Sequence, residues 1–214
     1  MIETRDPLNF VGRCRRQIST ITQQPHLSIT RQETAHGDRY IFSVNSASLT
    51  EAEGRIYIVI PFCSLGSQKY WLATSMEFTS GRISRLSSIS LVLFAGDATE
   101  ERKIVLLRAE WDSLDGDSPH AQPHWHVYQN RINTLNGQVE NIANKLTFGH
   151  APNWDRCEEF HFAMSAQWPF NGINSHILDM EEDGVLGWLE GCLKYIKQEL
   201  SYLAERKKRV IAPE

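Results

Sequence analysis

Residues 104–128, IVLLRAEWDSLDGDSPHAQPHWHVY, predict a β-hairpin that decides both the fold class and the position of a candidate site. The segment 104–112 begins with leucine and β-branched residues and then alternates between polar and apolar side chains, which is typical of a half-buried strand. Residues 113–122 are rich in Ser, Asp, Gly and Pro, which favour a loop. The alternation resumes from Pro123, so a second strand is expected to pair with the first.

The polar side chains of this hairpin fall on one face if both apolar faces, with Trp111 and Trp125, point toward the core. Cross-strand neighbours on one face lie about 5 Å apart, close enough to interact or to share an ion. The polar residues of the two strands are Arg108, Glu110, Asp112, His124, His126 and Tyr128. A β-bulge in either strand would break this arrangement by one residue.

The rest of the chain predicts one α+β domain over residues 1–214, with a largely antiparallel sheet of six or more strands between an N-terminal helix and a long C-terminal helix. Segments between 26 and 112 read as an antiparallel meander, and no strand–helix alternation typical of a parallel sheet is present. The expected strands are 27–33, 39–46, 54–62, 69–78, 86–95 and 103–112, followed by a strand around 157–166. A short helix is expected around 136–145.

An amphipathic helix is expected over 7–23, with Asp6 as its N-cap. Its apolar stripe is Leu8, Val11, Cys14, Ile18 and Ile21. The arginines at 13, 15 and 16 crowd the other surface, and they are either a solvated face or a contact for a phosphate backbone or an acidic partner.

The C-terminal helix is expected over 184–207, with Asp183 as N-cap. Apolar residues recur at alternating spacings of three and four, which is the pattern of a helical seam. The seam residues are Leu186, Leu189, Leu193, Ile196, Leu200 and Leu203. They pack either on the sheet of the same chain or on another subunit, so this helix is also a candidate for a protein partner or self-association.

Composition excludes several classes of protein. With 41% hydrophobic residues and a formal charge of −4, the chain can form a sizeable core and has no general attraction to nucleic acids or anionic membranes. Its four cysteines are scattered without a CxxC motif, which favours reduced thiols and a cytoplasmic location. No phosphate-cradling glycine motif occurs, and the longest apolar run, ISLVLFA, is far short of the roughly 18 residues of a membrane span.

The HAQPHWH stretch carries the strongest chemical signal. Two histidines two residues apart on a strand point the same way, which suits two imidazoles on one metal ion, and Glu110 or Asp112 would complete a two-histidine, one-carboxylate set for a divalent transition metal. His161 and His120 are further candidates for ligands. The candidate catalytic residues are Arg108, Glu110, His124 and His126, and the candidate metal ligands are His124, His126, Asp112 and His161.

Two other interpretations of the same residues remain open. In one, a histidine acts as general base or nucleophile without a metal while Arg108 holds an anionic phosphate. In the other, the residues form an Arg–Glu–His hydrogen-bonded network that only rigidifies the sheet. The spacing departs from that of histidine-triad hydrolases, since Tyr128 stands at the third histidine position.

The pairing of RAEWD, residues 108–112, with PHWH, residues 123–126, resembles a pattern in small uncharacterised proteins of bacterial toxin and defence operons. The resemblance implies a bacterial operon partner and assigns no chemistry. The first hypothesis is therefore a non-catalytic accessory subunit of an intracellular bacterial complex, possibly related to defence. The alternative is a small metal-dependent or histidine-based phosphodiesterase or nuclease that uses Arg108, Glu110, His124 and His126.

Overall fold

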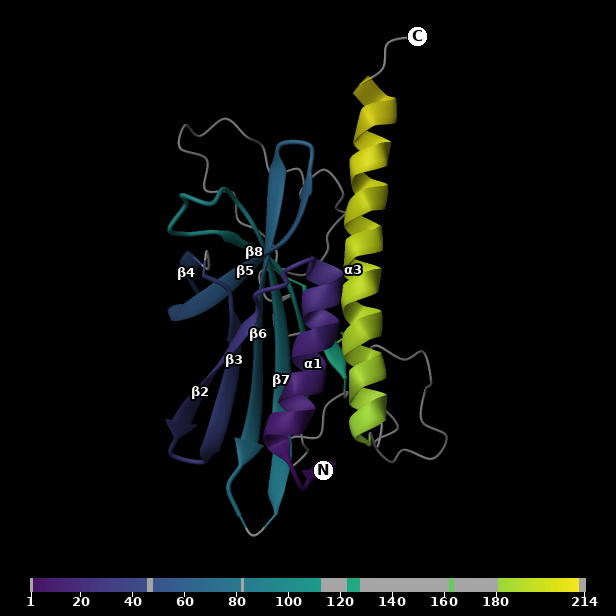
Figure 1. Ribbon diagram of the computed structural model, residues 1–214. Coiled ribbons are helices and arrows are strands. Elements are labelled where there is room, and N and C mark those ends of the chain that lie inside the picture. The colour runs from purple at the N-terminus through teal and green to yellow at the C-terminus, as the bar shows by residue number, and fades with distance from the viewer. Residues whose placement is uncertain are drawn as a thin grey trace, which may run out of the picture.

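The computed structural model describes residues 2–45, 48–81, 83–112, 123–127, 162–163 and 181–211. Within these residues the fold is α+β, with two helices on one face of a twisted sheet (Figure 1). Every strand pairing in the described part of the chain is antiparallel, as the sequence predicted.

The strands are close to those expected, with two additions, β1 and β4. They are β1 (Ile2–Thr4), β2 (Ser28–Thr34), β3 (Gly37–Ser43), β4 (Ser48–Ala52), β5 (Arg55–Leu65), β6 (Gln68–Thr79), β7 (Ser84–Ala95), β8 (Ile104–Asp112), β9 (His124–Val127) and β10 (Phe162–Ala163). Neither strand has a clear sequence pattern. β1 has only three residues, and β4 contains Ser, Ala and Glu, which do not favour strands.

The meander interpretation was wrong in one respect, because β6 changes partner along one edge. Residues 75–79 of β6 pair with β3, whereas residues 68–72 pair with β5. The main sheet therefore runs β10-β9-β8-β7-β6-β3-β2. Gly37 allows the junction with β6, since a Cβ there would lie 1.9 Å from the carbonyl oxygen of Phe78.

The helices α1 (Pro7–Thr22) and α3 (Glu182–Ile211) lie side by side against one face of the sheet (Figure 1). Their buried side chains share one apolar core with alternate residues of the central strands. The sheet residues of that core include Tyr40, Phe42, Leu72, Met76, Phe78, Leu86, Ile89, Leu91, Ala109 and Trp111.

α1 begins as predicted, with the Asp6 side chain accepting a hydrogen bond from the backbone N–H of Asn9 at 3.0 Å. The predicted stripe was wrong at Leu8, which is 60% exposed, because Phe10 takes the buried place in the first turn. Arg13 pairs with Glu182 and Asp183 of α3, so it joins the two helices. Arg15 and Arg16 remain exposed.

α3 starts at Glu182, so Asp183 lies in its first turn rather than at the N-cap. Its seam packs within the chain: Leu186, Leu189, Leu193, Ile196 and Leu200 all belong to the core between helix and sheet. The side chain of Leu203 lies outside the described residues. Neither described helix is long and apolar enough to cross a membrane.

The opposite face of the sheet is only partly covered. At one end, β4 and the first half of β5 fold over it and enclose a smaller apolar cluster. That cluster is Val59, Trp71, Ala73, Val92, Phe94 and Val105, with Ala52 and Tyr57 against it. A hydrogen bond of 2.8 Å from the backbone N–H of Lys103 to the buried Thr50 hydroxyl ties β4 to the segment before β8. This β4–β5 hairpin forms a roof over part of the polar face.

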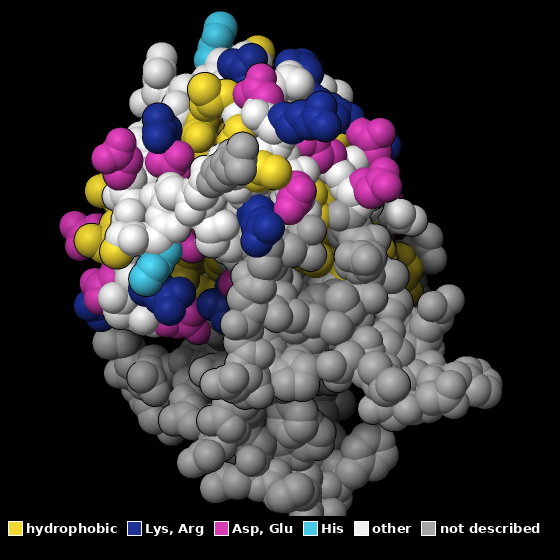
Figure 2. All heavy atoms as spheres, turned by 90° about the horizontal axis from the view of Figure 1, so that it is seen from below, with side chains coloured by type: hydrophobic (Ala, Val, Ile, Leu, Met, Phe, Trp, Pro, Cys, Tyr) yellow, Lys and Arg dark blue, Asp and Glu magenta, His cyan; other side chains and the backbone are white. Residues whose placement is uncertain are grey.

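The end of the molecule at the β6–β7 hairpin carries basic and acidic side chains interspersed, without one dominant sign (Figure 2). Arg31 and Asp38, Arg39 and Glu77, and Arg85 and Glu3 are ion pairs of this kind. The expected helix around 136–145 lies outside the described residues.

Candidate metal centre and adjoining cavity

The hairpin from the centre of the sequence forms with the predicted register. Arg108 lies opposite His126 and Glu110 lies opposite His124, while Ala109 pairs with Trp125 on the other face. No bulge interrupts β8 and β9 between these pairs, so the alternation of side chains is preserved. The predicted shared face of these four residues is confirmed.

Three potential ligand atoms converge on this face. The Nε2 atoms of His124 and His126 lie 2.9 Å apart. One carboxylate oxygen, Oε2 of Glu110, lies 3.1 Å from Nε2 of His126 and 3.8 Å from Nε2 of His124. Both histidines are buried, with His124 wholly inaccessible to solvent and His126 4% exposed.

These separations match those of ligands around one metal ion. Atoms bound at about 2.0–2.2 Å and at angles of about 90–120° lie about 2.8–3.8 Å from one another. All three measured distances fall in this range. Glu110, His124 and His126 can therefore supply three ligands to a divalent transition metal, the set found among the described residues.

Arg108 completes the group from the same strand as Glu110. Its Nε lies 3.2 Å from Oε2 of Glu110. Burial alone would raise the pKa of Glu110, but the hydrogen bond with His126 and the charges of Arg108 and the histidines together bring that pKa below its usual value. Glu110 is consequently a carboxylate at neutral pH, the form that binds a cation.

The same distances between Glu110, His124 and His126 also fit hydrogen bonds without a metal ion. An Nε2–H of one imidazole would then donate to Glu110, and the second imidazole would share a proton with the first. This is the Arg–Glu–His network anticipated from the sequence. The two arrangements differ in whether an exchangeable cation is bound, so metal analysis separates them.

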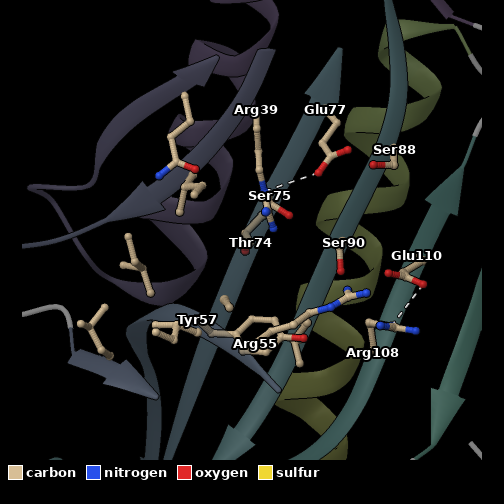
Figure 3. A pocket seen from close by; sticks show the side chains of 17 residues that line it. Arg39, Arg55, Tyr57, Thr74, Ser75, Glu77, Ser88, Ser90, Arg108 and Glu110 are labelled. Atoms are coloured by element: carbon tan, nitrogen blue, oxygen red, sulfur yellow. Dashed lines mark ion pairs between the residues drawn. The ribbon is translucent and has the colours of Figure 1, made fainter. Parts of the chain in front are cut away.

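A cavity of about 860 Å³ opens beside the group, between the polar face of the sheet and the β4–β5 roof (Figure 3). Arg108 and Glu110 form part of its wall, each with a side chain less than one-fifth exposed. Ser75, Ser88 and Ser90 form much of its floor, and the Arg39–Glu77 ion pair lies at the other end. Both histidines lie on β9, the neighbouring strand, so Glu110 is the residue of the candidate metal group that borders the cavity.

The other predicted site residues are placed as follows. Asp112 lies two positions further along the same face, opposite Ser88, and the converging group contains Glu110 instead. His161, His120 and Tyr128 lie outside the described residues. β10 pairs Ala163 with His124, so a third strand does join the hairpin where one was expected.

The sequence analysis missed the cavity residues on β5, β6 and β7. A signal for them was present in the alternation of Ser75, Glu77, Ser88 and Ser90 with buried apolar residues. These strands were interpreted only as core strands because their apolar half is so strong. Arg55 carried no signal, since its place depends on the β4–β5 roof.

No family model, curated protein or solved structure matches this chain.

Proposed function

We propose that this protein is a metal-dependent phosphodiesterase whose divalent ion is held by Glu110, His124 and His126. The observation that carries the proposal is the convergence of three ligand atoms, with an arginine beside them, at the wall of a polar cavity. A network needed only for rigidity would not require an adjoining space of this size. Metal ligands with open positions do require one.

Each residue then has a defined task. The two imidazoles and the Glu110 carboxylate would hold the cation, and a divalent ion bound there would supply a water of lowered pKa as the nucleophile at neutral pH. Arg108 fixes the Glu110 oxygen and presents its guanidinium to a phosphate oxygen. Hydrolysis adds water across the P–O bond and releases an alcohol and a phosphomonoester.

The test combines metal content with activity on bis(p-nitrophenyl) phosphate. We expect about one equivalent of a transition metal in the wild type and activity that is lost with a chelator and restored by the metal. His126→Ala should lose both while keeping its circular dichroism spectrum. His36→Ala, at an exposed turn, is the matched control and should lose neither.

A wild-type protein that holds no metal and hydrolyses no phosphodiester would rule out this function. If His126→Ala only lowers the melting temperature, the group is a structural network.

A role as an accessory subunit is the second candidate, supported by exposed aromatic side chains on α3. Tyr195 and Tyr202 are both 55% exposed and seven residues apart, although the ring of Tyr195 also lies 6.4 Å from that of Trp125 on β9. The seam itself is used inside the chain, so a partner of a bacterial complex would contact the exposed parts of these two rings. Loss of association in Tyr202→Ser, measured by light scattering on the complex, would support it. For either role we propose a cytoplasmic location, consistent with the free thiols of Cys14 and Cys63.

A further inference from the structure

The cavity beside the candidate metal centre contains a third arginine, for which the described residues provide no ion pair. Arg55, at the start of β5, makes no ion pair with any described residue, whereas Arg39 and Arg108, the other arginines of the cavity, each face a glutamate. Figure 3 shows the guanidinium of Arg55 on the side of the cavity where Ser90, Arg108 and Glu110 lie. Among the described residues, the cavity therefore has one guanidinium without a carboxylate partner, in the same cavity as Arg108 and Glu110.

An uncompensated arginine beside a metal centre favours an anionic group. Guanidinium binds phosphate oxygens through two parallel hydrogen bonds and keeps its charge at any physiological pH. Arg55 and Arg108 approach from opposite sides, one from the roof and one from the sheet. Together they would hold a phosphate next to the ion.

The size of the cavity indicates a ligand larger than a phosphate ion. At about 860 Å³ it lies within the range of sites for organic ligands of roughly drug size. Its serine floor offers hydroxyls to polar groups, and Ser75 and Ser90 lie opposite each other on β6 and β7. A sugar with free hydroxyls would be compatible with this floor.

The rim of the cavity is apolar on the roof side. Leu49 and Ile56 are 62% and 74% exposed, unusual for side chains of this size, and both line the cavity together with Tyr57. Exposed aliphatic side chains beside a polar cavity favour a ligand with a flat apolar part. Tyr57 packs edge-on against Phe94, which holds its ring in place at this rim.

We propose that the cavity binds a nucleotide, with the phosphate between Arg55 and Arg108, the ribose over the serine floor and the base against Leu49 and Ile56. The inference rests on the proposed function, since it assigns the substrate class of the same site. It adds Arg55 as a phosphate-binding residue and Ile56 as a determinant of base binding.

The experiment measures binding of adenosine 5′-monophosphate, ribose 5-phosphate and adenosine by calorimetry, with the metal content determined on the same samples. We expect the nucleotide to bind at least about tenfold more tightly than either fragment. Arg55→Gln should weaken the nucleotide and ribose 5-phosphate about tenfold or more and leave adenosine and the metal content unchanged. The control is Arg16→Gln on α1, an exposed arginine outside the cavity.

A second pair of variants tests the base. Ile56→Ser should weaken the nucleotide several-fold and leave ribose 5-phosphate unchanged, whereas Ile104→Ser, on an exposed strand position outside the cavity, should change neither. Equal affinities for the nucleotide and ribose 5-phosphate, or an Arg55→Gln variant that binds like the wild type, would overturn the inference.

The metal content separates the two claims. A protein that holds the metal but does not bind the nucleotide contradicts the ligand class and leaves the metal-dependent function standing. A protein that binds the nucleotide without any metal supports the ligand class and contradicts the metal-dependent function.

Discussion

The two faces of the central strands are built from neighbouring residues and serve different ends. On β7, Ile89 and Leu91 point into the core beneath the helices, while Ser88 and Ser90 face the cavity. The helix-covered face gains its stability from apolar burial at about 25 cal/mol per Å². The cavity face instead carries serines and charged pairs at positions where apolar residues would make the fold more stable. Polar residues that lower the stability of a fold at one place are typical of a functional site.

The histidines stand at the border between these two faces. His124 is as inaccessible as the core leucines, yet its ring meets the polar group rather than the core. Burial of this kind keeps water away from the imidazoles and strengthens every electrostatic contact among them. We therefore expect stability to depend mainly on the helix-covered face and the proposed chemistry on the cavity face. The following variants test this expectation, beginning with the largest effect.

Thiol reactivity should distinguish most strongly the centre of the helix-covered core from its edge, where Cys63 packs against the same core. Burial raises the pKa of Cys14 and of Cys192 from 9.0 to about 12, so at mildly alkaline pH they carry about a thousandfold less thiolate than an ordinary cysteine. Cys63, which is half-buried, serves as the internal reference. Peptide mass spectrometry after brief iodoacetamide treatment should find Cys63 alkylated well before the other two. Equal rates would mean that the helix face opens readily.

The seam of α3 should give the largest loss of stability. Ile196 is 3% exposed in the core, and truncating it to alanine leaves a cavity, so Ile196→Ala should cost about 2–5 kcal/mol in urea unfolding. Leu8→Ala, at a helical position that is 60% exposed, should change the free energy of unfolding by less than about 0.5 kcal/mol. Similar losses from the two variants would refute the placement of the seam.

In protein treated with a chelator, the contribution of the Glu110 carboxylate to the free energy of unfolding should depend on pH. Because the folded state holds the pKa of Glu110 below the 4.5 of a free carboxyl, its contribution is present above about pH 4.5 and is lost as the pH falls through the folded value. Glu110→Gln should therefore cost about 1–3 kcal/mol near neutral pH and progressively less in acid. A cost that stays constant down to about pH 3 would contradict the charged network.

The separation of an apolar face from a polar face could largely be predicted from the sequence, because it follows from the alternation of apolar and polar residues along each strand. The parity of β8 and β9 held because the extra residue of β8 at the Leu93/Phe94 irregularity is Leu106, just before Leu107, where the pairing with β9 begins. The other irregularity, at Glu77/Phe78, lies between β6 and β7. Pairing of β3 with β6 could not be read, because it joins segments more than thirty residues apart with nothing local to mark it. Convergence of three ligand atoms depends on side-chain rotamers, and a spacing of two residues specifies only that the rings share a face.

The smallest change in the free energy of unfolding is expected for a substitution on the cavity floor. Ser90→Ala removes one hydroxyl from a partly exposed position and should shift the free energy of unfolding by no more than about 0.5 kcal/mol. Its neighbour Ile89 is fully buried, and Ile89→Ala should cost several times more. Thermal denaturation of the two variants side by side checks the contrast. A Ser90→Ala variant as unstable as Ile89→Ala would mean that the floor is structural.

X-ray absorption spectroscopy of the protein loaded with zinc gives the most direct test of the proposed metal centre. We expect one zinc ion with two imidazole nitrogens at about 2.0–2.1 Å and oxygen ligands from Glu110 and solvent. In His124→Ala the imidazole signal should fall to one ring. A first shell of sulfur ligands, or imidazole scattering unchanged in His124→Ala, would contradict a metal centre at Glu110, His124 and His126.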